Sequence, residues 1–110
     1  MDCIFCKLAK GEIPTEKLYE DDKIFVIKDI HPKAETHLLV IPHVHIESLN
    51  EVDESHEHLL GYMMSSLKNF AKTQGLAGFR TIINTGKAGG QEIFHLHIHL
   101  VGGKRLPGFN

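Results

Sequence analysis

The chain has 110 residues and a mass of 12.4 kDa, enough for a single hydrophobic core, and we expect one domain over residues 1–110. Hydrophobic residues make up 42% and charged residues 24% of the sequence, which is typical of a soluble globular protein and excludes a disordered or fibrous one. The formal net charge of −2 gives no global electrostatic reason to bind nucleic acid or an anionic membrane, so we expect neither as a partner.

The N-terminal region contains a Cys-x-x-Cys pair, Cys3 and Cys6, but no apolar run that resembles a signal peptide or a membrane span. We therefore expect a cytoplasmic protein. Two cysteines this close in sequence cannot form a disulfide that links distant parts of a domain. In a reducing compartment they indicate metal binding, redox chemistry or reduced thiols on an apolar helix face. A thioredoxin-like role is disfavoured because no βαβ pattern surrounds the pair.

The first elements predicted are a short helix and a hairpin. Residues 3–10 form the helix, which ends at Gly11 and places three apolar side chains on one face: Ile4, Phe5 and Leu8. Residues 17–20 and 23–28 are runs of strand-forming residues separated by two aspartates, a turn-prone pair. This pattern predicts two antiparallel strands.

A central strand and a long helix follow. Residues 37–41 form a continuous apolar run ended by Pro42, which predicts a strand buried on both faces in the middle of a sheet. From about Asp53 to Gln74, apolar residues recur at three- and four-residue spacing, which predicts one amphipathic helix. Asp53 or Ser55 can cap its start, and Gly75 can end it.

Two more strands complete the predicted fold, at residues 78–84 and 94–101. The order is helix, three strands, long helix, two strands, without repeats or linkers. We therefore expect an α+β fold, a five-stranded antiparallel sheet with one long and one short helix, both on one side of the sheet.

The last predicted strand carries three alternating histidines, His95, His97 and His99. Since side chains alternate between the faces of a strand, the imidazoles should share one face while the aliphatic residues between them enter the core. Histidine is the side chain whose ordinary pKa lies nearest neutrality, so such a strand can supply a nucleophile, a proton donor and a metal ligand. The simpler interpretation is a solvated or metal-binding histidine-rich strand.

A glycine-rich loop at residues 86–90 precedes this strand. It is neither a Walker motif nor a dinucleotide-binding motif, and alone it is more often an ordinary hairpin loop than a phosphate site. Its main-chain N–H groups could nevertheless form an anion-binding concavity. If the two last strands pair, Asn84 would converge with His97 and His99 on the same anion.

Several segments together resemble the histidine triad family of nucleotide-binding proteins, and most closely its Hint branch of nucleoside phosphoramidate hydrolases. They span nearly the whole chain: Ile13-Pro14, Tyr19-Glu20-Asp21-Asp22, Asp29-Ile30, Ala34, the run from Thr36 to Pro42, Asn84, Gly89-Gly90-Gln91 and His95-x-His97-x-His99-Leu100-Val101-Gly102-Gly103. A lone His-x-His-x-His would be weak evidence, whereas all of these segments in order indicate the family. The resemblance implies a histidine triad fold, a homodimer and an AMP-type purine nucleotide as substrate.

The resemblance also implies catalytic roles. His97 would attack the α-phosphorus, displace an amine and form a nucleotidyl-histidine that water hydrolyses to a nucleoside monophosphate. Such an imidazole needs its far nitrogen to donate a proton to a fixed acceptor such as a backbone carbonyl. His99 would hold a phosphoryl oxygen, with Asn84 as a neutral donor. His37 would orient the site or move protons; alternatively it only ends a strand. No catalytic cofactor is implied.

The remaining nucleotide contacts come from the same comparison. Asp29 matches the acidic ribose ligand, although it could also only form a turn. The apolar walls of the base pocket are matched by Ile13, Ile27 and Ile30, although as isolated residues these are more often simple core. The other matching nucleotide contacts, at the glycine loop, are Gly90, Gln91 and Glu92. Glu92 stands where many relatives carry a serine that contacts the leaving group, so the preference for a leaving group is not implied.

A structural zinc site is the last implication. Some bacterial relatives carry such a site, and the matching residues are Cys3, Cys6, His45 and His95. Four sulfur and nitrogen ligands suit tetrahedral zinc. The alternative functions are a dinucleoside polyphosphate hydrolase or nucleotidyl transferase of a sister branch, a non-catalytic nucleotide-binding regulatory module, and a small zinc-stabilised domain without turnover.

Overall fold

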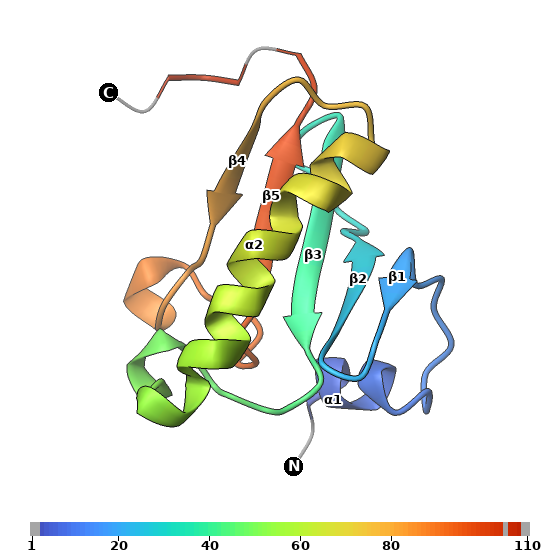
Figure 1. The fold of residues 1–110 in the computed structure, drawn as a ribbon. Helices are drawn as coiled ribbons and strands as arrows, with labels where there is room; N and C mark the ends of the chain where they lie inside the picture. Colours follow the sequence, from blue (N-terminus) through green and yellow to red (C-terminus); the bar gives the residue numbers. More distant parts are fainter. Residues whose placement is uncertain (1–2, 105, 109–110) are drawn as a thin grey trace.

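The computed structural model describes residues 3–104 and 106–108, and its central feature is a five-stranded antiparallel sheet (Figure 1). The strands are β1 (Tyr19–Glu20), β2 (Ile24–Lys28), β3 (Thr36–Pro42), β4 (Phe79–Ile82) and β5 (Ile98–Gly102), in the spatial order β1-β2-β3-β5-β4. The α-helices are α1 (Ile4–Ala9) and α2 (Glu57–Thr73), with 3-10 turns η1 (Leu49–Glu51), η2 (Glu54–His56) and η3 (Lys87–Gly89). The predicted fold class is confirmed.

β3 occupies the middle of the sheet, as its apolar sequence predicted. It pairs with β2 on one side and β5 on the other, and every residue after Thr36 in the strand is buried. The pairing sets Leu39 opposite His99 and Leu38 opposite Leu100, so neighbouring β5 residues point to opposite faces. This register fixes the face on which His99 lies.

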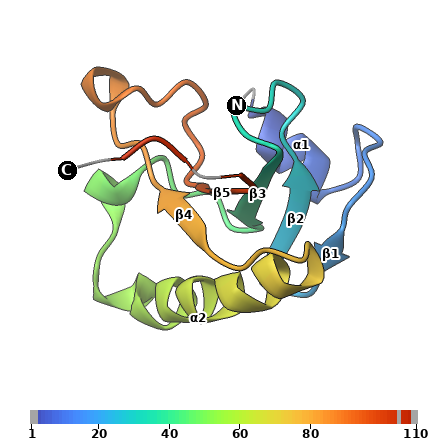
Figure 2. The same ribbon diagram turned by 90° about the horizontal axis from the view of Figure 1, so that it is seen from above.

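The two helices cover opposite faces of the sheet, contrary to our expectation that both would lie on one side (Figure 2). On one face Ile24 and Val26 join the apolar cluster that contains α2 residues, whereas Phe25 and Ile27 join the cluster that contains α1 residues. A strand that is apolar at four consecutive positions buries both of its faces, and one helix cannot cover both. We call the two sides the α1 face and the α2 face.

α2 is shorter than the sequence predicted, because the first turn of that segment is a 3-10 turn. Asp53 caps this turn: its Oδ1 accepts the N–H of Ser55 at 2.9 Å, and its own N–H donates to His56 Nδ1 at 3.1 Å. The α-helix begins at Glu57 and ends before Gly75, whose φ of 72° suits the predicted stop. Among the described residues, no helix combines the length and apolarity needed to cross a membrane.

The histidine strand also begins later than predicted, at Ile98 instead of residue 94. Pro42 has no N–H to extend the ladder between β3 and β5, and its carbonyl accepts a hydrogen bond from His95 Nε2 at 2.8 Å. The N–H of Leu96 donates to Ile46 O, outside the sheet. His95 and His97 therefore lie on an irregular segment that leads into β5, and only His99 lies within the strand.

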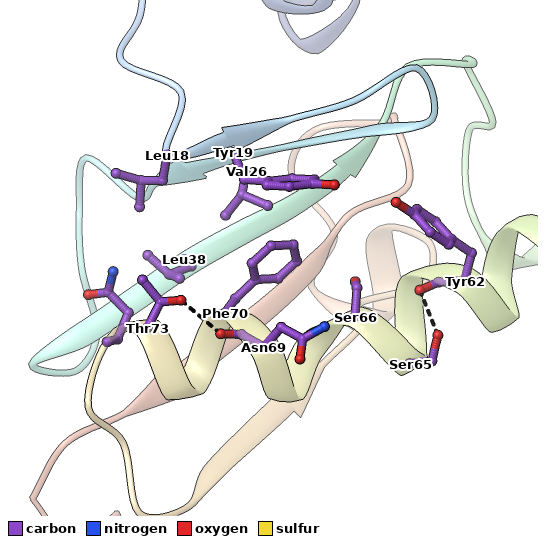
Figure 3. A pocket seen from close by; sticks show the side chains of 11 residues that line it. Leu18, Tyr19, Val26, Leu38, Tyr62, Ser65, Ser66, Asn69, Phe70 and Thr73 are labelled. Carbon is purple, nitrogen blue, oxygen red and sulfur yellow. Dashed lines mark hydrogen bonds between the residues drawn. The ribbon is translucent and has the colours of Figure 1, made fainter.

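A groove of about 370 Å³ lies on the α2 face, between the second half of α2 and the first three strands (Figure 3). Its apolar side chains include Leu18, Val26, Leu38 and Phe70, and its polar ones include Asn69. His99 points to the other face, since it pairs with Leu39 of the α1 cluster. The groove is thus separate from the histidines.

Candidate active site and metal centre

Four segments bring the predicted catalytic side chains together on the α1 face. His37 is the second residue of β3, His99 lies in β5, and Asp29 immediately follows β2. Asn84 follows β4, whose Ile82 pairs with His99. The rings of His97 and His99 are 4.9 Å apart and those of His37 and His99 are 5.1 Å apart, measured between centroids. The expected convergence of these residues is present.

His97 is held by the main chain of its own segment. Its Nδ1 lies 2.7 Å from the carbonyl oxygen of His95, so Nδ1 carries the proton and donates it. Nε2 then keeps its electron pair. Burial lowers the pKa of His97, which favours the neutral imidazole. A neutral ring with a free Nε2 is the form that can attack an electrophilic phosphorus.

His37 and His99 form a hydrogen-bonded pair beside this ring. His37 Nε2 lies 2.9 Å from His99 Nδ1 and 3.4 Å from the Asp29 carboxylate. Burial, together with the nearby His97 and His37, lowers the pKa of His99 to about 4. Burial also lowers the pKa of His37, against the opposing effect of Asp29. Both rings are therefore neutral near pH 7.

Asn84 and Asp29 lie at the two ends of this pair. The side-chain amide of Asn84 is 3.4 Å from His99 Nε2, so one anionic oxygen can contact both groups. Asp29 Oδ1 accepts the N–H of His31 at 2.8 Å, which is the turn considered from the sequence. Its Oδ2 faces His37. Asp29 thus forms a turn and also reaches the histidine site.

The glycine loop differs from the predicted concavity of free N–H groups. Gly89 and Gln91 donate their N–H groups to Gly86 O, and Gly90 donates to Lys87 O. The loop closes as a 3-10 turn, with Gly86 and Gly90 at φ values of 75° and 90° that favour glycine. These amides are therefore not available to an anion. Asn84 remains as a donor beside the loop.

Gln91 fastens this loop to the rest of the molecule. Its side chain is buried, and Oε1 accepts the N–H of Gly86 at 2.9 Å. Its Nε2 donates to Glu47 O at 2.7 Å and to Ile93 O at 3.0 Å. We predicted Gln91 as a nucleotide contact, but its side-chain hydrogen bonds go to the loop and to the segment after β3. Both the side-chain amide and the main-chain N–H of Gln91 are therefore engaged within the protein.

The other predicted nucleotide contacts differ in exposure. Ile27 is buried in the α1 cluster, whereas Ile13 is 36% exposed and Ile30 is 86% exposed. Glu92 is exposed, next to the buried Gln91. An isoleucine as exposed as Ile30 contributes little to the core and is free to contact a ligand.

Phe5 is a neighbour of the site that the sequence analysis assigned only to a helix face. Its buried ring meets the ring of His97 edge-on at 5.1 Å and that of His95 at 5.8 Å. It lies between the two cysteines on α1, which connects the helix to the candidate nucleophile. Ile4, placed on the same face from the sequence, is instead 48% exposed.

The four predicted metal ligands also come together, beneath α1. One donor atom from each of Cys3, Cys6, His45 and His95 lies within 4.8 Å of the other three. His95 Nδ1 is 3.2 Å from Cys3 Sγ, 3.5 Å from Cys6 Sγ and 3.1 Å from His45 Nδ1, and Cys6 Sγ is 3.3 Å from His45 Nδ1. In tetrahedral zinc sites, with Zn–N near 2.05 Å and Zn–S near 2.3 Å, ligand atoms stand about 3.3 to 3.8 Å apart. Two of the four distances lie in this range and the other two are 0.1 to 0.2 Å shorter, so the ligand spacing is close to that of a zinc site.

The protonation of this cluster supports the same fit. His95 Nε2 donates to Pro42 O, so its Nδ1 directs an electron pair toward the two sulfurs. Burial and the adjacent Cys3 raise the pKa of the Cys6 thiol, so a thiolate there needs a cation. His45 Nε2 is buried and has no hydrogen-bond partner among the described residues, unlike its counterpart in His95. A bound zinc would hold α1 against the sheet.

Known proteins of one family are similar to this chain over most of its length. The family model described as "Scavenger mRNA decapping enzyme C-term binding" matches residues 2–109. Protein HitA of Neisseria gonorrhoeae is 54% identical over 102 residues, which are 92% of this chain and 95% of HitA. The purine nucleoside phosphoramidase of Escherichia coli K12 is 42% identical over 107 residues, covering 96% of this chain and 90% of that protein.

Solved structures give the same result. A histidine triad protein from Clostridium difficile superposes with a TM-score of 0.94 and 43% identity, covering all of this chain and 97% of that one. A zinc-bound histidine triad family protein from Mycobacterium smegmatis gives a TM-score of 0.79 and 32% identity over 93% of this chain and 75% of that one. The chain belongs to the histidine triad family.

Proposed function

We propose that this histidine triad hydrolase splits the P–N bond of purine nucleoside phosphoramidates, in which AMP is joined to an amine, and releases AMP. The observation that carries the proposal is the hydrogen bond from His97 Nδ1 to the His95 carbonyl, which leaves Nε2 free beside His99 and Asn84. The similarity to the phosphoramidase of Escherichia coli supports the choice of substrate class.

The reaction proceeds in two displacements. His97 Nε2 forms a bond to the α-phosphorus while the P–N bond breaks, and the departing amine takes up a proton from water. Water then attacks the same phosphorus and loses a proton to the solvent while the bond from phosphorus to His97 Nε2 breaks, which releases AMP and restores the neutral His97. His99 and Asn84 hold a non-bridging oxygen during both steps, where negative charge is greatest.

The nucleoside occupies the open side of the α1 face in this proposal. Asp29 accepts hydrogen bonds from the ribose hydroxyls with the electron pairs that the N–H of His31 leaves free. Ile13, Ile27 and Ile30 contact the base. Glu92, beside the glycine loop, faces the leaving group, where a carboxylate favours a cationic amine.

A structural zinc ion and a second copy of the chain complete the proposal. Cys3, Cys6, His45 and His95 hold the zinc, which takes no part in the reaction. The dimer forms through β4, an edge strand with exposed Phe79 and Ile82, since an unpaired edge with apolar side chains favours pairing. The location in the cytoplasm stays a prediction.

Steady-state assays test the proposed reaction. AMP joined to a simple amine should be turned over faster than a dinucleoside polyphosphate, and a folded His97→Ala protein should bind AMP without turnover. Faster cleavage of the dinucleoside polyphosphate would favour the sister-branch activity. AMP binding without turnover by the wild-type protein would indicate a regulatory module, and the absence of both would leave a zinc-stabilised domain.

A further inference from the structure

The loop between β2 and β3 contains a main-chain N–H, that of Lys33, which donates to an active-site histidine and has no role in the proposed reaction. Asp29 closes the loop at its base by donating its N–H to His37 O at 2.9 Å, and its side chain forms the turn at His31. Pro32 follows. Inside this turn the N–H of Lys33 donates to His37 Nδ1 at 3.0 Å. A main-chain donor fixed by the fold therefore contacts one nitrogen of an active-site imidazole.

This contact determines where the proton of His37 lies. An N–H donates only to an electron pair, so Nδ1 of His37 is unprotonated and the neutral ring carries its proton on Nε2. His37 Nε2 is 2.9 Å from His99 Nδ1 and 3.4 Å from Asp29 Oδ2, so its one proton is donated to the nearer acceptor, His99 Nδ1. His99 then accepts at Nδ1 and carries its own proton on Nε2, which lies 3.4 Å from Asn84 Nδ2. Both groups are donors, so they do not bond to each other and can both donate to one anionic oxygen placed between them.

We propose that Lys33 is a positioning residue whose main-chain N–H holds His37, and through it His99, in the tautomer protonated on Nε2. His99 thereby presents a hydrogen-bond donor to the phosphoryl oxygen, a step that rests on the proposed function. His97 receives the opposite tautomer from the carbonyl of His95. The carbonyl of His95 thus leaves Nε2 of His97 unprotonated and able to act as the nucleophile. The N–H of Lys33, acting through His37, leaves Nε2 of His99 protonated and able to donate.

The same contact argues against a second metal site. The donor atoms of Asp29, His37 and His99 lie within 4.8 Å of one another, the composition of a two-histidine, one-carboxylate metal site. A metal on His37 Nε2 would move the ring proton to Nδ1, where it would meet the N–H of Lys33, a donor facing a donor. At His95 the carbonyl of Pro42 instead leaves Nδ1 unprotonated. The two clusters therefore differ in what they can bind.

Two substitutions at Lys33 separate its main chain from its side chain. Lys33→Ala keeps the N–H and removes only the side chain, whose Nζ donates to His31 O at 2.9 Å. Lys33→Pro removes the N–H. Lys33→Pro should lower kcat roughly 3- to 10-fold, the factor that one neutral hydrogen bond represents, with KM changed less than about twofold. Lys33→Ala should match the wild type in both constants. Equal kcat values for two folded variants would overturn the proposal.

Imidazole ¹⁵N NMR of the wild-type protein tests the tautomers without turnover, even if Lys33→Pro does not fold. The expected result is a proton on Nε2 in His37 and His99, on Nδ1 in His97, and a tautomer mixture at His37 in folded Lys33→Pro. A proton on Nδ1 of His37 in the wild type would overturn the proposal, however active the protein is. The expected tautomers in a protein that does not cleave phosphoramidates would support the role of Lys33 in positioning and reject the proposed function instead.

Discussion

Replacing Gln91 by leucine should destabilise the protein strongly, although the residue is on a loop. The Gln91 side chain makes three hydrogen bonds to main-chain groups: to Gly86 N–H, Glu47 O and Ile93 O. Leucine fills a similar volume but bonds to none of them. The three groups would lose their partner in a place where the side chain is only 4% exposed.

The magnitude follows from the number of bonds. Each neutral hydrogen bond contributes about 1 kcal/mol, and a buried group left without a partner costs about 1 to 3 kcal/mol. Gly86 is half-buried, so water can reach part of the loop, and we expect a loss of about 3 kcal/mol for Gln91→Leu. In a domain of this size that lowers the melting temperature by roughly 10 to 20 °C.

Urea denaturation of Gln91→Leu, followed by circular dichroism, measures this loss. Glu92→Leu is the matched control, because Glu92 is the adjacent residue, is exposed and makes no hydrogen bond among the described residues. It should change stability by less than about 0.5 kcal/mol. A Gln91→Leu protein as stable as Glu92→Leu would refute the view that Gln91 fastens the loop.

Three further predictions concern pH, zinc and assembly. His99 has a pKa of about 4 in the folded protein and about 6.5 when unfolded, so the unfolded chain binds the extra proton between these values. Stability should fall as the pH falls from 6.5 to 4, less steeply in His99→Gln; equal pH slopes would contradict this. Protein purified without chelator should contain about one zinc per chain, and Cys3→Ser should lose it and melt lower; a metal-free protein unaffected by Cys3→Ser would exclude the site. Light scattering should give a dimer that Phe79→Glu dissociates, and a monomeric wild type would exclude it.

The features that the sequence predicted depend on periodicity and on order along the chain. The apolar run at β3 identified the middle strand, because a strand buried on both faces cannot lie at an open edge of the sheet. The four consecutive apolar residues of β2 likewise indicate a strand that is buried on both faces, which requires a helix on each face of the sheet. The residues of the catalytic site and of the metal site were predicted from a family resemblance that covers nearly the whole chain.

The features that the sequence did not predict depend on main-chain positions within loops. The hydrogen bonds of Lys33 and Gln91 require particular loop conformations, which residue types alone do not specify. β5 begins later than predicted because Pro42 has no N–H to extend the pairing between β3 and β5, and this proline is visible in the sequence. The contact between Phe5 and His97 joins residues far apart in the chain, so an apolar helix pattern cannot reveal it.

The covalent intermediate on His97 is the central claim, and rapid-quench mass spectrometry of the intact protein tests it most directly. Wild-type protein mixed with a phosphoramidate of AMP should gain the mass of one nucleotidyl group within the first turnover, on the peptide that contains His97. The His97→Ala protein should bind AMP and gain no mass. Phosphoramidate turnover by the wild type without an adduct, together with near-normal turnover by His97→Ala, would contradict the account.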